Sequence, residues 1–103
     1  YTRSVVELGA AHDGVLGFIG NGSRPNELAN LRQKVGQQKM IWTPGVNLEV
    51  GDGEMGQRYG DPYAAILAGS DCIIVGSGIH GAKYPKVAAE SYAQISWNAL
   101  QDR

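Results

Sequence analysis

Three short apolar runs, each followed by a segment with helical spacing, constrain the fold of this chain more than any other feature. The runs cover residues 15–19, 40–43 and 72–75. Each run is continuous rather than alternating, which is typical of parallel strands that are covered on both faces. The sequence therefore predicts an α/β protein in which parallel strands alternate with helices.

Helical signals lie between, before and after these runs. Residues 26–35 carry leucines at helical spacing, and Asp61 followed by Pro62 supplies an N-cap and a first-turn proline. Residues 4–11 fit the end of a further helix before the first run. The last helix is expected to bury one face, formed by Ala88, Tyr92, Ile95 and Ala99. This order of elements predicts right-handed βαβ units.

The number of strands is too small for a closed barrel. An eight-stranded (β/α)-barrel typically takes ~250 residues, whereas this chain has 103 residues, enough for one core at most. We therefore expect either a part of a longer polypeptide or a piece that completes its sheet by associating with other chains. A complete three-stranded α/β domain is the alternative.

Composition and charge exclude several classes of function. Nine Lys and Arg residues balance ten Asp and Glu residues without a basic stripe, so nucleic-acid binding is not expected. No apolar stretch is long enough for a membrane span, and a cytoplasmic location is the expectation. His12 and His80 have no partners at metal-ligand spacing, so no metal site is expected. Trp42 and Trp97 are expected to fill the core.

A glycine-rich turn follows the third run and is the strongest candidate for chemistry. Gly76, Ser77 and Gly78 come directly after the apolar residues. Such a turn can aim successive backbone N–H groups at one point, where the next helix adds partial positive charge, and this suits a phosphate. His80 follows closely and could donate a hydrogen bond. The alternative is that a tight strand-to-helix turn needs glycine for conformational reasons alone.

A long loop follows the second run and spans residues 43–60. Loops of this length are often lids over a binding site. Gln57 can donate its amide and Tyr59 its hydroxyl to a phosphate oxygen, while Pro44 offers a rigid apolar wall to a planar ring. A solvated loop rich in turn residues is the alternative.

Three segments resemble consecutive signatures of one enzyme family in order and spacing. They are Thr43-Pro44-Gly45-Val46, Gly56-Gln57-Arg58-Tyr59 and Gly69-Ser70-Asp71-Cys72-Ile73-Ile74-Val75-Gly76-Ser77-Gly78-Ile79. The family is the eukaryotic type of orotidine 5′-phosphate decarboxylase, as in the decarboxylase half of UMP synthase. The likeness extends to Tyr1-Thr2, to Gly17-Phe18-Ile19 and to Ala88-Ala89-Glu90-Ser91-Tyr92 with Trp97, and so covers nearly the whole chain.

This resemblance implies a fold and an activity. Residues 1–103 would be the C-terminal segment of a single TIM (β/α)8 barrel, containing strands six to eight with their helices, and the N-terminal strands would be absent from this chain. The family converts orotidine 5′-phosphate (OMP) to UMP and CO2 in de novo pyrimidine biosynthesis, as a homodimer and without a cofactor. The implied partners are OMP or UMP and the remainder of the barrel or a second subunit.

The resemblance also implies the site residues. The substrate phosphate would be held by Gln57 and Tyr59 and by the backbone of Gly76 and Ser77, with Pro44 beside the pyrimidine. The family normally has an arginine where this sequence has Ser77, and a hydroxyl cannot replace the paired charge-assisted hydrogen bonds of a guanidinium. This change is expected to weaken phosphate binding about ten- to hundredfold.

The catalytic residues of the family have no counterpart in this sequence. They form an Asp-x-Lys-x-x-Asp array on earlier strands, and that motif does not occur here. No residue is therefore predicted to be catalytic, and the segment alone is expected to bind weakly and to catalyse nothing. The alternatives are a non-enzymatic or divergent phosphate-binding and self-associating barrel fragment, and another phosphate-binding barrel enzyme.

Overall fold

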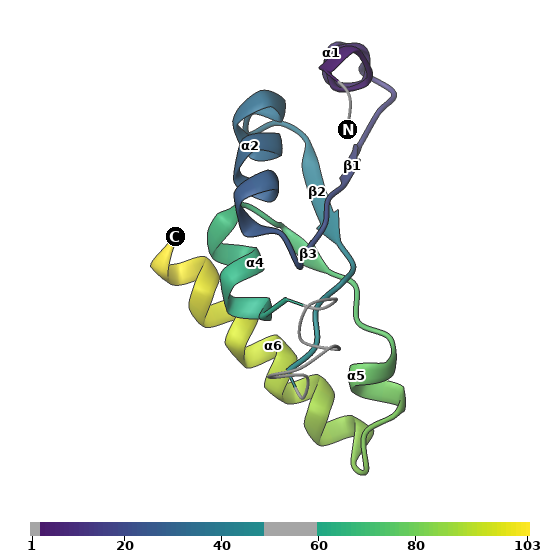
Figure 1. Ribbon diagram of the computed structural model, residues 1–103, viewed down its shortest axis with the longest axis vertical. Helices are drawn as coiled ribbons and strands as arrows, with labels where there is room; N and C mark the ends of the chain where they lie inside the picture. The colour runs from purple at the N-terminus through teal and green to yellow at the C-terminus, as the bar shows by residue number, and fades with distance from the viewer. Residues whose placement is uncertain (1–2, 49–59) are drawn as a thin grey trace.

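A parallel sheet of three strands with helices along one side forms the framework of the chain (Figure 1). The computed structural model describes residues 3–48 and 60–103. Its elements in chain order are α1 (Arg3–Ala11), β1 (Gly17–Ile19), α2 (Pro25–Val35), β2 (Met40–Thr43), α4 (Pro62–Ala68), β3 (Cys72–Ile73), α5 (Ser77–His80) and α6 (Pro85–Asp102). The strands lie in the order β1-β2-β3 and both pairs are parallel, so the predicted α/β arrangement is confirmed.

Prolines set the starts of the longer helices. Pro25, Pro62 and Pro85 each stand at the beginning of a helix, where the missing N–H would have no partner and the fixed φ suits the first turn. Asp61 caps α4 as the sequence predicts, because its carboxylate accepts a hydrogen bond from the Tyr63 N–H at 3.1 Å. No helix within the described residues is long and apolar enough to cross a bilayer.

The core lies between the sheet and the helices. Leu28 of α2 and Ile41 of β2 are almost completely buried there. The buried cluster consists of Val6, Phe18, Leu28, Leu31, Val35, Ile41, Val46 and Ala65. In Figure 1, α2 and α4 lie along the same side of the sheet and α6 crosses beside α4. One layer of helices therefore covers one face of the sheet.

The other face of the sheet is exposed and apolar. Ile19, Trp42 and Ile74 are 51%, 38% and 42% exposed, and we call these three residues the exposed sheet face. Successive side chains in a strand point to opposite faces, so burying Phe18 on the helix side leaves Ile19 on the other. The expectation that the strands are covered on both faces is wrong for the described residues, because no element of theirs packs on this second face.

The expected burial of both tryptophans is also wrong. Trp42 lies on the exposed sheet face, and Trp97 of α6 is 56% exposed. The buried residues of α6 are Tyr92 and Ala99, and Trp97 belongs to a different face of that helix. Helical spacing identified the buried face of α6, but the presence of an aromatic ring did not predict burial.

The strands are shorter at their ends than the apolar runs that predicted them. The first run begins at residue 15, but pairing begins at Gly17. The third run continues to residue 75, whereas β3 is Cys72–Ile73. The Ile74 N–H still donates to the Thr43 carbonyl at 2.7 Å, so the ladder extends one bond beyond the strand. The second strand coincides with its predicted range.

A buried arginine joins the amino ends of β2 and β3. Arg32 of α2 is 9% exposed and forms an ion pair with Asp71. Its guanidinium also donates to the Gly69 carbonyl at 2.8 and 2.9 Å, to the Gly36 carbonyl at 2.8 Å and to the Lys39 carbonyl at 3.0 Å. We call these five residues the Arg32 cluster. It satisfies three backbone carbonyls that precede the two strands.

The signature at residues 69–71 is explained by this cluster. Gly69 has φ +133°, and a Cβ there would lie 2.7 Å from the Cβ of Arg32, so only glycine fits. The Ser70 hydroxyl lies 2.9 Å from that of Thr43, and both side chains are completely buried. Asp71 also accepts a hydrogen bond from the Ile41 N–H at 2.9 Å. Gly69 and Asp71 therefore hold the sheet together at the edge where its strands begin, and Ser70 joins the start of β3 to the last residue of β2.

Candidate functional site

The carboxyl ends of the three strands meet at one edge of the sheet, and the candidate site lies there. Ligands of open parallel sheets bind outside the carboxyl ends of the strands. The Gly22 N–H donates to the Pro44 carbonyl at 2.9 Å, which joins the segments after β1 and β2. The bond from Ile74 to Thr43 joins β2 to the segment after β3. Three loops are therefore neighbours at this edge.

Glycines allow the backbones of these loops to touch. A Cβ on Gly22 would lie 2.7 Å from the Pro44 carbonyl oxygen, and one on Gly60 would overlap the Gly22 carbonyl oxygen. Gly45 has φ +80°, and its carbonyl accepts a hydrogen bond from the Gly60 N–H at 2.6 Å. With no side chain between them, the loops form a close backbone junction beside β2.

The turn after β3 contains backbone donors that no described residue accepts from. Gly76 precedes α5, and its carbonyl accepts hydrogen bonds from the amides of Ile79 and His80 at 3.0 and 3.1 Å. Among the described residues, the N–H groups of Gly76, Ser77 and Gly78 have no acceptor. Gly76 and Ser77 are exposed. An anion at this turn would meet donors without having to displace internal hydrogen bonds.

The predicted site residues are brought together in part. Pro44 is exposed directly after β2, and Gly76 and Ser77 form the turn after the neighbouring strand β3. These three residues lie at the same edge of the sheet, as expected from parallel strands. Gln57 and Tyr59 lie outside the described residues, so their contact with a phosphate stays a prediction.

A histidine lies beside the same turn. The His80 Nε2 atom lies 3.9 Å from the position of a Cβ on Gly76. His80 is exposed, and its ring lies near Gly76, the residue that precedes Ser77. Its imidazole can therefore donate a hydrogen bond to a group that lies at this turn.

Tyr92 is the residue of this region that sequence reasoning missed. It belongs to α6, is 3% exposed, and its hydroxyl contacts segments that follow both β2 and β3. Helical spacing placed Tyr92 on the buried face of the last helix. Nothing in a linear pattern indicates which backbone atoms a buried hydroxyl will meet, so no sequence signal marked its contacts.

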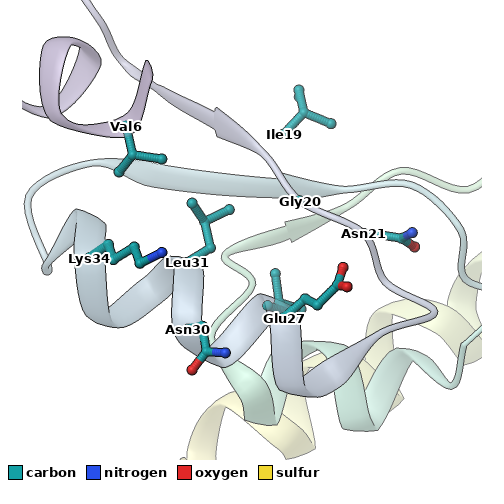
Figure 2. Close-up of a pocket in the computed structure, with 9 residues that line it drawn as sticks. Val6, Ile19, Gly20, Asn21, Glu27, Asn30, Leu31 and Lys34 are labelled. Carbon is teal, nitrogen blue, oxygen red and sulfur yellow. The ribbon is translucent and has the colours of Figure 1, made fainter. Parts of the chain in front are cut away.

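A separate hollow of the described residues lies elsewhere. It has a volume of about 470 Å³ and is bounded by α1, the end of β1 and α2 (Figure 2). Figure 2 shows Asn21 and Glu27 toward one end and Lys34 at the other, with Val6 and Leu31 between α1 and α2. β1 is the end strand of the described sheet that lies away from β3. The hollow is therefore separate from the turn at Gly76.

Solved structures share this arrangement over most of the chain. The crystal structure of orotidine 5′-phosphate decarboxylase from Pyrococcus horikoshii OT3 matches 91% of this chain and 40% of its own, with a TM-score of 0.72 and 26% identity. The enzyme from Lactobacillus acidophilus matches 91% of this chain and 35% of its own, with a TM-score of 0.71 and 26% identity. Both are TIM-barrel enzymes, so the described elements correspond to a part of such a fold.

Curated relatives match the entire chain. Orotidine 5′-phosphate decarboxylases from Penicillium nalgiovense, Coccidioides immitis (strain RS) and Schizosaccharomyces pombe are 34%, 38% and 37% identical to it. Each alignment covers 100% of this chain but only 38%, 38% and 37% of the relative. The chain therefore spans little more than a third of the length of these relatives.

The family comparison agrees with both results. The sequence profile described as Orotidine 5′-phosphate decarboxylase / HUMPS family matches residues 1–92. The match includes all three signature segments that carried the resemblance, which is thereby confirmed. This chain belongs to the orotidine 5′-phosphate decarboxylase / HUMPS family.

Proposed function

We propose that this chain is the C-terminal, phosphate-binding part of an orotidine 5′-phosphate decarboxylase that converts OMP to UMP and CO2. The observation that carries the proposal is the match of the whole chain to proteins of that name at 34–38% identity. The turn at Gly76 and Ser77 supports the phosphate-binding role, because its amides have no acceptor among the described residues. A cytoplasmic location and a homodimer remain predictions.

The proposal assigns β1, β2 and β3 to strands six, seven and eight of a barrel. In a closed barrel the inward side chains of the strands fill the interior, which would cover the exposed sheet face of Ile19, Trp42 and Ile74. The hollow beside β1 is where a preceding strand with its helix would pack. The relatives are longer than this chain, and in this proposal their additional residues form the other strands and helices of the barrel.

Phosphate binding far from the reacting carbon would serve catalysis by positioning the pyrimidine. Binding energy from a remote group lowers the barrier when it orients and desolvates the reacting centre. In this proposal Gln57, Tyr59 and the amides of Gly76 and Ser77 hold the phosphate, and Pro44 lies beside the ring. The proton that replaces CO2 would come from residues outside this sequence, which contains no Asp-x-Lys-x-x-Asp motif.

The substitution Ser77→Arg tests the phosphate site in the complete protein. Restoring a guanidinium at the turn should tighten UMP binding about ten- to hundredfold, because a charged hydrogen bond contributes roughly 1.5–3 kcal/mol. Calorimetric titration with UMP measures the change. Ser91→Arg, which adds the same charge at an exposed position of α6, is the matched control and should have little effect. Unchanged affinity for the Ser77 variant would show that the turn is not the phosphate site.

Turnover tests the activity itself. The complete protein should release CO2 from carboxyl-labelled OMP without added cofactor. If it binds UMP but releases no CO2, the second candidate function stands: a divergent, non-enzymatic phosphate-binding module. The serine at position 77 is the observation that favours this candidate. The resemblance implies an arginine at this position, and a serine lacks the guanidinium charge that would bind the substrate phosphate.

A further inference from the structure

The hydroxyl of Tyr92 lies where the segment after β2 meets the turn after β3. It accepts a hydrogen bond from the Leu48 N–H at 2.7 Å. It also lies so close to the backbone of Gly78 that a Cβ on that glycine would overlap it. A second contact, from the hydroxyl to the Asn47 side-chain oxygen at 3.5 Å, is at the limit for a hydrogen bond and adds less.

Burial restricts the position of the Tyr92 hydroxyl. Tyr92 is 3% exposed and projects from α6, the longest helix of the described residues. A buried tyrosine hydroxyl requires a partner, and a tyrosine ring has only two side-chain torsions to adjust. The position of α6 therefore determines where the Leu48 amide can lie.

Gly78 is the point at which the turn contacts the interior. It is buried, whereas Gly76 and Ser77 before it are exposed. On its inner side a Cβ would also come within 3.2 Å of the Val75 side chain, so no larger residue fits between the turn and Tyr92. The hydroxyl and ring of Tyr92, together with the Val75 side chain, therefore lie directly behind the turn at Gly78.

We propose that Tyr92 is a positioning residue that sets the phosphate-binding turn at a fixed place relative to the segment after β2. The inference rests on the proposed function, because it assumes that the turn binds a phosphate. Tyr92 is not proposed as a catalytic residue, because its hydroxyl accepts a hydrogen bond from the Leu48 N–H and lies on the inner side of Gly78. Displacing donors by more than about 0.5 Å is enough to spoil a binding constellation.

The test compares a nucleotide with its nucleoside. In the complete protein, Tyr92→Phe removes only the oxygen that contacts Leu48 and Gly78. We expect UMP binding to weaken about tenfold, the scale of one misplaced hydrogen bond to a charged group, while uridine binding stays the same. A general loss of structure would lower both affinities, so the ratio of the two dissociation constants isolates positioning of the phosphate site.

Tyr63→Phe is the matched control. The Tyr63 hydroxyl donates to the Asp102 carboxylate at 2.6 Å and joins α4 to the end of α6, away from the turn. The substitution Tyr63→Phe removes the same hydroxyl oxygen from another tyrosine in the same layer of helices. The ratio of UMP to uridine affinity should remain that of the wild type.

The outcomes separate the two ideas. If the wild type binds UMP no better than uridine, the proposed function fails. If the wild type prefers UMP and Tyr92→Phe keeps that preference, the positioning role is overturned while the proposed function stands.

Hydrogen exchange on the wild type provides a second measurement that does not depend on the variant folding. UMP should slow amide exchange at Leu48 as well as at Gly78, because the hydroxyl of Tyr92 links them. Slowing at Gly78 alone would overturn the inference.

Discussion

Replacing Arg32 with methionine would test what holds the amino ends of the strands together. Methionine keeps the unbranched, flexible chain but removes every donor of the guanidinium. The carbonyls of Gly69, Gly36 and Lys39 would lose their side-chain partner, and Asp71 would lose its ion pair. The Arg32 cluster therefore loses both hydrogen bonds and charge balance in one substitution.

The expected cost follows from burial. Removing one partner of a buried ion pair costs about 3–5 kcal/mol. The Asp71 side chain is 28% exposed and keeps the Ile41 N–H at 2.9 Å and Arg103 at 3.5 Å, so part of its charge remains compensated. We expect the lower end of the range, about 3 kcal/mol, which is a large share of a typical stability of about 5–15 kcal/mol.

Urea unfolding of the complete protein measures this loss, with Arg24→Met as the control. Arg24 pairs with Glu27 at 3.2 Å, but the two side chains are 65% and 64% exposed, so its removal should cost less than about 1 kcal/mol. If the two variants lose the same stability, the buried cluster does not hold the strands as argued.

Two further predictions concern other parts of the chain. Trp42→Ala in the complete protein should cost about 3–5 kcal/mol in urea unfolding, because a closed barrel would bury the exposed sheet face; a loss below about 1 kcal/mol would contradict the assignment to strands six to eight. The hydrogen bond to Asp102 raises the pKa of Tyr63 above its usual 10.0, with smaller contributions from desolvation and from the charge of Asp102. This bond therefore stabilises the fold below pH 10 and is lost as pH rises through the raised pKa. Tyrosinate absorbance can be titrated in the wild type and in Tyr63→Phe, and the difference between the two curves gives the ionisation of Tyr63. This ionisation should have its midpoint above pH 10, and a midpoint at or below pH 10 would refute the bond.

Local signals predicted most of the elements. Asp61 and Pro62 fix the start of α4 through a side chain and a ring that act within one turn, so the cap could be predicted without tertiary information. Pro44, Gly76 and Ser77 lie at one edge because parallel strands bring their carboxyl ends together. The family signatures predicted which of these loops contribute to the candidate site.

What the sequence did not predict depends on contacts between distant residues. The burial of Arg32 results from Asp71, 39 positions later in the chain, and an isolated arginine on a helix would have been expected in solvent. Tyr92 meets Leu48 across 44 positions. The exposure of Trp42 was mispredicted because an apolar run does not show whether its second face has a covering layer.

The Arg32 cluster and the turn at Ser77 stand at opposite ends of the same strands. Among the described residues, no hydrogen bond joins the Arg32 cluster to Pro44, Gly76 or Ser77. A substitution at position 77 is therefore expected to leave the hydrogen bonds of the Arg32 cluster intact. If the turn binds a ligand, its affinity can change by substitution there while the sheet and its helices keep their fold.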